Sequence, residues 1–541
     1  MRRSTLLVDD WLRDWPLLPF SLVRLRLRAR VHVGSVVRCL SDRRVQLATG
    51  LLMVAVLAFL GVVQAPVFVD EADNVLSACL ISRGALPYRD FFSHHFPLPY
   101  YVLAALGEPA ACSVLAARLV GVLSLTVAAA LFAWAARNPL VPAALLLLGL
   151  TGPLYYAQLY LAETWIMVGL IASVGLLTDA GLRLRGPVAW TVRFLALMSL
   201  AWSSPLGLMM AALLLPLMVL GAGRPYLPAA SAGAAALLVW PLGLALQGTL
   251  PSFIDQGVRF NTEIYGRYLD VQLTNPVALL WETLMFARHR FAFGMDWLMS
   301  GGEKATAASF AALFELLLTV LLAALLVCRR NERLFRLGVL LLVPLAVSRD
   351  GFHLSPYIAL ALFACAQLLS PTIWRSGRLQ LVAVAVVLVA VRVYFFFLPT
   401  DLHAPSELAA SLQSEKQIVR YAAPEAAVLF LPIAPHGYLA DDRRPGSFFT
   451  YFLPWQADLP GAQERLIADI DANEVAVIVL DQETLLWDKY RLRDYAPLVL
   501  AHIQANYHPV DSQDRRKARF FVRGAAPVEA STRPAGASTR R

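Results

Sequence analysis

Acidic and histidine side chains gather in the segment that follows the first long apolar run of the chain. Asp70, Glu71 and Asp73 come directly after that run, and the pair His94 and His95 follows before the next apolar sequence. Carboxylates at the mouth of a membrane span are costly to hold there unless they have a function. This arrangement predicts a polytopic enzyme whose active site lies at the membrane surface.

More polar residues fall on the same predicted side of the membrane. They are Glu163, His289 and the late sequence Arg349-Asp350-Gly351-Phe352-His353. Chance placement would scatter such residues over both faces. Their convergence on one face is the main functional argument that the sequence offers.

Each of these groups also has a structural interpretation. Asp70 and Glu71 could cap a helix N-terminus, because acids favour its positive end. The histidine pair could form an interfacial turn or, with carboxylates, bind a divalent metal ion, although the spacing matches no recognised ligand pattern. Glu163 could lie at the water interface, and the late sequence could be a polar turn. We therefore assign no metal ligands, and a divalent metal ion remains one possible cofactor.

Composition places the chain among membrane proteins. Of its 541 residues 58% are hydrophobic and only 16% are charged, and the mean hydropathy is +0.59. A soluble chain of this length would carry about 25% charged residues. The formal net charge of +9 comes mainly from basic residues between apolar runs, which is typical of cytoplasmic loops. Nucleic-acid binding is therefore not expected.

The apolar runs predict an α-helical polytopic domain at residues 45–398, with about eleven transmembrane helices. The basic segment 1–44 is expected on the cytoplasmic side, and the outer loops at 65–111 and 248–304. The long run 194–223 is divided in two at Ser203-Ser204-Pro205-Leu206-Gly207, since Pro and Gly weaken a helix. The predicted spans are 45–64, 112–136, 139–157, 159–177, two within 194–223, 226–247, 305–328, 334–348, 354–369 and 379–398.

The C-terminal sequence has a different composition. Residues 399–525 predict a small extracytoplasmic α/β domain, and residues 526–541 a disordered tail. Strands are expected at 428–431 and 475–480, and helices at 406–421, 462–470 and 495–507. The run Asp441-Asp442-Arg443-Arg444 predicts a solvated turn. Cys79 and Cys112 could pair in one outer loop, but two free thiols are the favoured interpretation.

These motifs resemble those of the GT-C superfamily of polytopic glycosyltransferases. That superfamily includes the protein O-mannosyltransferases, the lipid A aminoarabinose transferases and bacterial relatives described as dolichyl-phosphate-mannose-dependent. The resemblance covers about residues 45–400. It rests on a basic N-terminus and one span before Asp70-Glu71-Ala72-Asp73, on 84–90 and 94–101, on Glu163 in 157–163, and on 349–353. One departure is that His95, where some relatives have Lys, precedes Phe96-Pro97.

The resemblance implies an inverting transferase that moves a hexose or pentose from a polyprenyl-phosphate donor to a cell-envelope acceptor at the outer face. Asp70 is expected to be the general base, and the other catalytic candidates are Glu71 and Glu163. Donor-phosphate candidates are Arg349, His353, His95 and Arg89. Candidates for an acceptor or sugar subsite are Asp73, His94, Tyr265 and Tyr268, although the two tyrosines suit a simple surface loop equally well.

Two other functions fit parts of the pattern. A polysaccharide polymerase or ligase would also be polytopic, but would more typically show a dominant outer loop between late spans. A secondary transporter would show inverted repeats and ionisable residues near the midplane. For the enzyme we expect a multi-pass protein of a bacterial plasma membrane, with the lipid bilayer, donor and acceptor as partners. The sugar, the acceptor and the prenyl length do not follow from the sequence.

Overall fold

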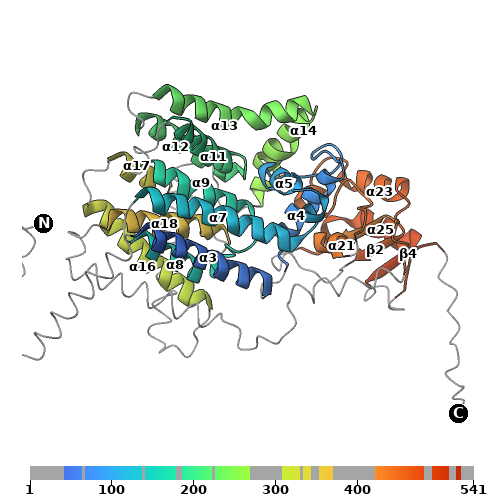
Figure 1. The fold of residues 1–541 in the computed structure, drawn as a ribbon. Helices are drawn as coiled ribbons and strands as arrows, with labels where there is room; N and C mark the ends of the chain where they lie inside the picture. Colours follow the sequence, from blue (N-terminus) through green and yellow to red (C-terminus); the bar gives the residue numbers. More distant parts are fainter. Residues whose placement is uncertain are drawn as a thin grey trace, which may run out of the picture.

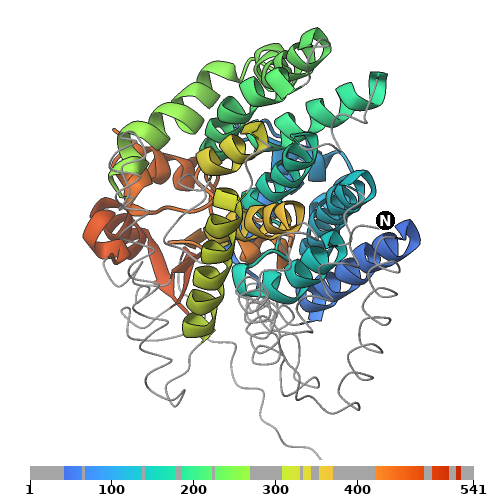
Figure 2. The same ribbon diagram turned by 90° about the vertical axis from the view of Figure 1, so that its left-hand side faces the viewer.

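The computed structural model shows a helical body joined to a small α/β lobe (Figure 1). It describes residues 42–63, 67–136, 140–177, 186–221, 226–268, 307–328, 333–342, 352–369, 421–440, 442–480, 490–510 and 519–524. The helices of the body run roughly alongside one another, and the view turned by 90° shows them gathered into one bundle (Figure 2). The α/β lobe lies at one end of this bundle, beyond α4 and α5.

A helix occupies every predicted span that lies in the described part of the chain. The long run is divided as expected, since one helix ends at Ala201 and the next begins at Pro205. The helices of the body are α3 (Arg43–Val63), α7 (Val114–Ala136), α8 (Val141–Thr151), α9 (Ala162–Leu176), α11 (Gly186–Ala201), α12 (Pro205–Gly221), α13 (Tyr226–Leu246), α16 (Ala307–Cys328), α17 (Arg333–Leu342) and α18 (Ser355–Leu368). The predicted last span, 379–398, lies outside the described residues.

Two of the described helices, at Val114–Phe132 and Tyr226–Leu246, are long and apolar enough to cross a membrane by length and composition. Helix α7 also presents leucine and valine to the outside at every fourth position, on one face of the helix. These exposed residues are Leu115, Leu119, Leu123, Val127 and Leu131. The number of membrane spans stays a prediction.

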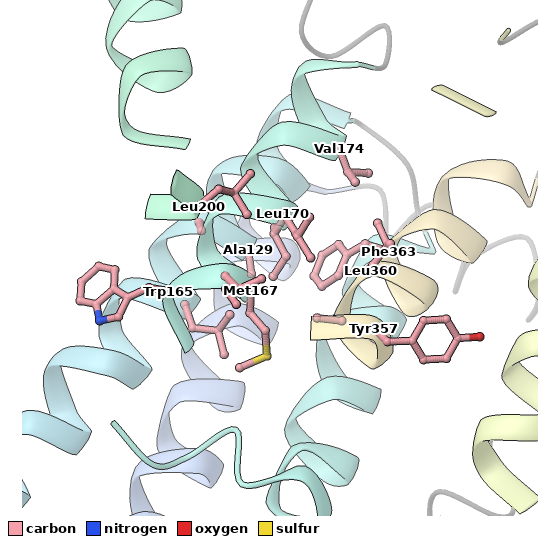
Figure 3. Close-up of a cluster of buried hydrophobic side chains, with 14 of the residues drawn as sticks. Ala129, Trp165, Met167, Leu170, Val174, Leu200, Tyr357, Leu360 and Phe363 are labelled. Atoms are coloured by element: carbon pink, nitrogen blue, oxygen red, sulfur yellow. The ribbon is translucent and has the colours of Figure 1, made fainter. Parts of the chain in front are cut away.

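The core of the body is formed where α7, α9, α11 and α18 pack together. Figure 3 shows side chains from these helices meeting there, among them Met167, Leu200 and Phe363. Helices α9 and α11 approach closely at Gly169, where a Cβ atom would lie 2.5 Å from the Leu200 side chain and 2.8 Å from the Ala196 carbonyl oxygen. This packing fixes the start of α9, which carries Glu163.

Short helices join the body to the lobe. They are α4 (Val69–Ser82), α5 (Leu98–Ala104) and α6 (Glu108–Ala111), followed much later by α14 (Leu250–Phe253), a π-helical segment η2 (Ile254–Ile264) and a short turn η3 (Tyr265–Arg267). Cys79 and Cys112 form a disulfide between the last turn of α4 and the end of α6. The favoured interpretation of two free thiols was therefore wrong, because the chain between them folds back on α4.

The α/β lobe contains a four-stranded sheet in the order β1-β2-β4-β3. Strand β1 (Val428–Leu431) pairs in parallel with β2 (Val477–Leu480), and the antiparallel strands β4 (Phe520–Arg523) and β3 (Tyr507–Pro509) follow. The first two strands lie where they were predicted. The helices are α21 (Pro435–Ala440), α22 (Pro454–Ala457), α23 (Ala462–Ala472), α24 (Leu492–Tyr495) and α25 (Pro497–Asn506). The predicted helix 406–421 falls almost entirely outside the described residues.

Candidate functional site

Helix α4 positions the three acids that open the outer segment. Its N-cap is Phe68, so Asp70 and Glu71 occupy the first turn of the helix rather than the cap position. Carboxylates are still favoured there by the helix dipole. Glu71 and Asp73 are buried, whereas Asp70 is partly exposed, so Asp70 is the one of the three that a substrate can reach most readily.

Glu71 is fully engaged in the interior of the protein. Its two carboxylate oxygens accept hydrogen bonds from Arg118 Nε at 2.8 Å and Nη2 at 2.6 Å. The backbone N–H of Tyr160 donates a third at 3.0 Å, and neither charged side chain is more than 1% exposed. This ion pair ties α4 to α7 and to the chain before α9. The geometry gives Glu71 a structural role, and we remove it from the catalytic candidates.

Asp73 lies beside His95. Oδ2 of Asp73 is 3.9 Å from Nε2 of His95. Burial and the neighbouring charge of Asp70 raise the pKa of Asp73 to about 8, and burial lowers the pKa of His95 to about 4. Both groups are therefore mainly neutral at pH 7, and their contact is one of two neutral groups rather than an ion pair. A protonated Asp73 can donate a hydrogen bond to a sugar hydroxyl.

Glu163 and His353 form a second contact between a carboxyl group and a histidine. Nδ1 of His353 lies 2.5 Å from Oε1 of Glu163, although 190 positions separate them in the sequence. Glu163 sits in the first turn of α9, and His353 in the turn just before α18. The hydrogen bond at Nδ1 fixes the orientation of the imidazole ring.

These groups form one site, which we call the acid–histidine cluster and define as Asp70, Asp73, His95, Glu163 and His353. His95 interacts electrostatically with both Glu163 and His353, and Asp73 with Asp70. Residues from four separate segments of the chain therefore meet.

Aromatic residues from the lobe and from η2 border the cluster. Nδ1 of His94 and the hydroxyl of Tyr451 form a hydrogen bond of 3.1 Å, in which the tautomer of the histidine decides which atom donates. The ring of His94 packs against those of Tyr265 and His95, with centroids 5.2 and 4.1 Å apart. The side-chain amide of Asn261 donates to the His94 carbonyl oxygen at 2.6 Å. His94 and Tyr265 thus lie beside the cluster, where a sugar could stack.

Two predicted site residues lie elsewhere. Arg89 is more than half exposed and bonds to Asp90, with Nε 2.9 Å from Oδ1. The hydroxyl of Tyr268 donates to Asp458 at 2.7 Å, and its ring packs against Trp455. We therefore take Arg89 out of the donor site and treat Tyr268 as part of the contact with the lobe. Arg349 and His289 lie outside the described residues.

Sequence reasoning missed Arg118 and Tyr451. Arg118 carried a signal, because a single arginine inside a long apolar run marks a buried partner. Tyr451 carried none, since it lies in a loop of the lobe and reaches His94 only through the tertiary fold.

Within the described residues, no group of three or more His, Cys, Asp or Glu side chains is arranged to hold a metal ion. The histidines of the cluster lie beside carboxyl groups, His95 beside Asp73 and His353 beside Glu163. The possible divalent ion therefore has no ligand set in this part of the chain.

Comparison with known proteins gives structural similarity only. No protein-family model and no curated protein sequence matches the chain. Two solved structures of the Archaeoglobus fulgidus oligosaccharyltransferase are similar in fold. One, tethered with an acceptor peptide containing the NVT sequon via a disulfide bond, has a TM-score of 0.46 and 10% identity, and covers 89% of this chain and 74% of its own. The other, a complex with zinc and sulfate, has a TM-score of 0.48 and 12% identity, and the match covers 85% of this chain and 71% of that structure's chain. At this similarity they assign neither a family nor the role of any residue.

Proposed function

We propose that the protein is a membrane glycosyltransferase that moves a monosaccharide from a polyprenyl-phosphate donor to a hydroxyl group of a cell-envelope acceptor. The observation that carries this proposal is the acid–histidine cluster. Its members come from α4, the loop before α5, the start of α9 and the turn before α18, and they meet where the helical body joins the lobe.

The acceptor side of the reaction needs a base. A sugar hydroxyl is a poor nucleophile, and a carboxylate beside it can remove its proton as the new bond forms. Asp70 is the partly exposed acid of α4, with the mainly protonated Asp73 next to it. In our proposal Asp70 takes the proton, and Asp73 orients the sugar by donating a hydrogen bond.

The donor side needs stabilisation of negative charge. The acceptor oxygen bonds to the anomeric carbon while the bond from that carbon to the phosphate oxygen breaks, which leaves a lipid phosphate and inverts the anomeric centre. His353 precedes the N-terminus of α18, where helix N–H groups favour an anion. We assign the donor phosphate to this position, with Glu163 holding His353 and with Arg349 as a further candidate.

The outward-facing apolar stripe of α7 supports a membrane location. Leu115, Leu123 and Leu131 are 40%, 58% and 51% exposed, and such a continuous exposed apolar face is typical of a surface that contacts lipid or another apolar partner. We propose a multi-pass protein of the plasma membrane, with the cluster and the lobe on the outer face.

A donor panel separates this function from its rivals. The purified protein in lipid would be offered radiolabelled polyprenyl-phosphate monosaccharides and, separately, pyrophosphate-linked oligosaccharides. We expect release or transfer of sugar from one monophosphate donor. Turnover of pyrophosphate-linked oligosaccharides alone would favour a polymerase or ligase, and uptake of a solute without any turnover would favour a transporter.

A further inference from the structure

A hollow lies between the outer segment and the lobe. It has a volume of about 350 Å³, which is at the lower end of the range of about 300–1,000 Å³ for small-molecule sites. Its walls come from the end of α4 and the chain after it, the loop after α21 and helix α23. We call it the arginine cavity and define it by Arg89, Arg444, Ser447, Phe448, Arg465 and Asn473.

Two arginines of this cavity are not paired with an acid. Nη2 of Arg444 donates to Asn473 Oδ1 at 2.8 Å, and the guanidinium of Arg465 lies 3.5 Å from the ring centre of Phe448. Among the residues that the structure describes, neither arginine has a carboxylate partner. The run 441–444 was predicted to be a solvated turn, and Asp442 does lie exposed in a turn. Arg444 is also exposed and lines the cavity, whereas Arg443 is buried.

The acids of the cavity already have partners. Asp90 accepts hydrogen bonds from Arg89 and from the Leu86 backbone N–H, the latter at 2.8 Å. Asp469 accepts bonds from Ser447 Oγ and the Phe448 N–H, both at 2.9 Å. Arg89 balances the charge of Asp90, whereas the partners of Asp469 are uncharged, so the lining of three arginines and two acids carries a net positive charge of one. Arg444 and Arg465 are the guanidinium groups of the lining that no carboxylate holds. Guanidinium groups bind carboxylate and phosphate oxygens by paired hydrogen bonds.

The arginine cavity and the acid–histidine cluster lie on the same short stretch of chain. Phe91 lines the cavity, and His94 borders the cluster three residues later. Three residues span at most about 10 Å. The N–H of Phe92 donates to the Phe448 carbonyl oxygen at 2.8 Å and holds this stretch against the lobe. One oligosaccharide could therefore reach both places.

We propose that the arginine cavity binds an acidic sugar unit of the acceptor, one that carries a carboxylate or a phosphate group. That the bound sugar belongs to the acceptor rests on the proposed function. The binding itself needs no donor. Polar contacts from Asn473 and Ser447 would meet the sugar hydroxyls, while Arg444 and Arg465 would hold the acidic group.

The test measures binding to the full-length protein in lipid nanodiscs without any donor. The probes are glucuronic acid and glucose 6-phosphate, with glucose as the uncharged match and inorganic phosphate as the free anion. We expect one acidic sugar to bind more tightly than glucose and than phosphate. Arg444→Gln and Arg465→Gln should each weaken that binding about tenfold, which is the loss of one charge-assisted hydrogen bond. Arg493→Gln, an exposed arginine of the same lobe paired with Asp494, should bind as the wild type does.

Three results would overturn the inference. They are no binding of either acidic sugar, equal binding by wild type and both glutamine variants, or phosphate binding as tight as that of the sugars, which would indicate a site for a free phosphate or a lipid headgroup. Asp70→Asn should keep acidic-sugar binding. If the wild type binds an acidic sugar through the arginines but turns over no donor, the cavity assignment stands and the proposed function fails.

Discussion

At the level of single residues, the charge of Asp73 depends strongly on the fold. Burial and Asp70 raise its pKa from 3.8 to about 8, so between these values the folded protein binds more protons than the unfolded chain. The contribution of Asp73 to stability therefore falls as the pH rises from about 4 to about 8, and is constant above that range. We predict that the unfolding temperature of Asp73→Asn, measured relative to that of the wild type, rises as the pH increases from 5 to 9.

The measurement is the unfolding temperature of both proteins across this range. Asp255→Asn is the control, because Asp255 is an exposed residue paired with Arg259 and should show no such gain. A difference between Asp73→Asn and the wild type that is independent of pH would contradict the raised pKa.

Glu71 and Arg118 give a second prediction at this scale. Removing one partner leaves the other charge buried and unpaired, which costs about 3–5 kcal/mol. Glu71→Gln and Arg118→Met should each lower the unfolding temperature strongly, and the double variant should lose less than the sum of the two. If Glu71→Gln instead kept full stability and lost only transfer activity, Glu71 would return to the catalytic residues.

At the scale of elements, the disulfide fixes the end of α4 against α6. Cys79 and Cys112 close a loop with a sequence separation of 33, and a crosslink of this kind stabilises a protein typically by about 2–4 kcal/mol. We predict that Cys79→Ser, Cys112→Ser and the double variant all lower the unfolding temperature to a similar extent. Peptide mapping without reductant should recover the two cysteines in one crosslinked fragment, and separate free-thiol peptides would contradict the pairing.

Most helices could be predicted from the sequence, because long apolar runs bounded by arginine have few alternatives. The break before Pro205 and the buried strands β1 and β2 followed from local chemistry in the same way. The disulfide could not be predicted, since it depends on how the chain between Cys79 and Cys112 turns back. The structural role of Glu71 was missed for a similar reason, because its partner Arg118 lies on another helix.

At the scale of the whole molecule, the lobe contributes to the site. Tyr451 reaches from the lobe to Nδ1 of His94, and Arg83 after α4 forms an ion pair with Asp442 of the lobe. No sequence pattern indicated this contact, since the lobe follows the last predicted span and its loops have no recognisable motif. The acid–histidine cluster could be predicted only as a set of residues on one face, and the fold supplies the pairs within it.

We predict that Tyr451→Phe slows sugar transfer about fivefold, because the lost hydrogen bond, worth about 1 kcal/mol, leaves His94 less well oriented. Tyr495→Phe is the matched control, since its hydroxyl bonds to the Phe452 carbonyl oxygen within the lobe. Initial rates at saturating donor would be compared for the two variants. Equal rates would show that the lobe does not act on the site through Tyr451.

If Asp70 is the base of a transferase site, transfer needs its carboxylate, and a comparison of rates shows whether it does. Transfer from the preferred polyprenyl-phosphate donor would be measured for the wild type, Asp70→Asn and Asp255→Asn in the same lipid, with the unfolding temperature of each as a check on folding. We predict that Asp70→Asn is folded and loses activity by a factor of about 100 or more, while Asp255→Asn retains it. Full activity in folded Asp70→Asn would show that Asp70 is not the base.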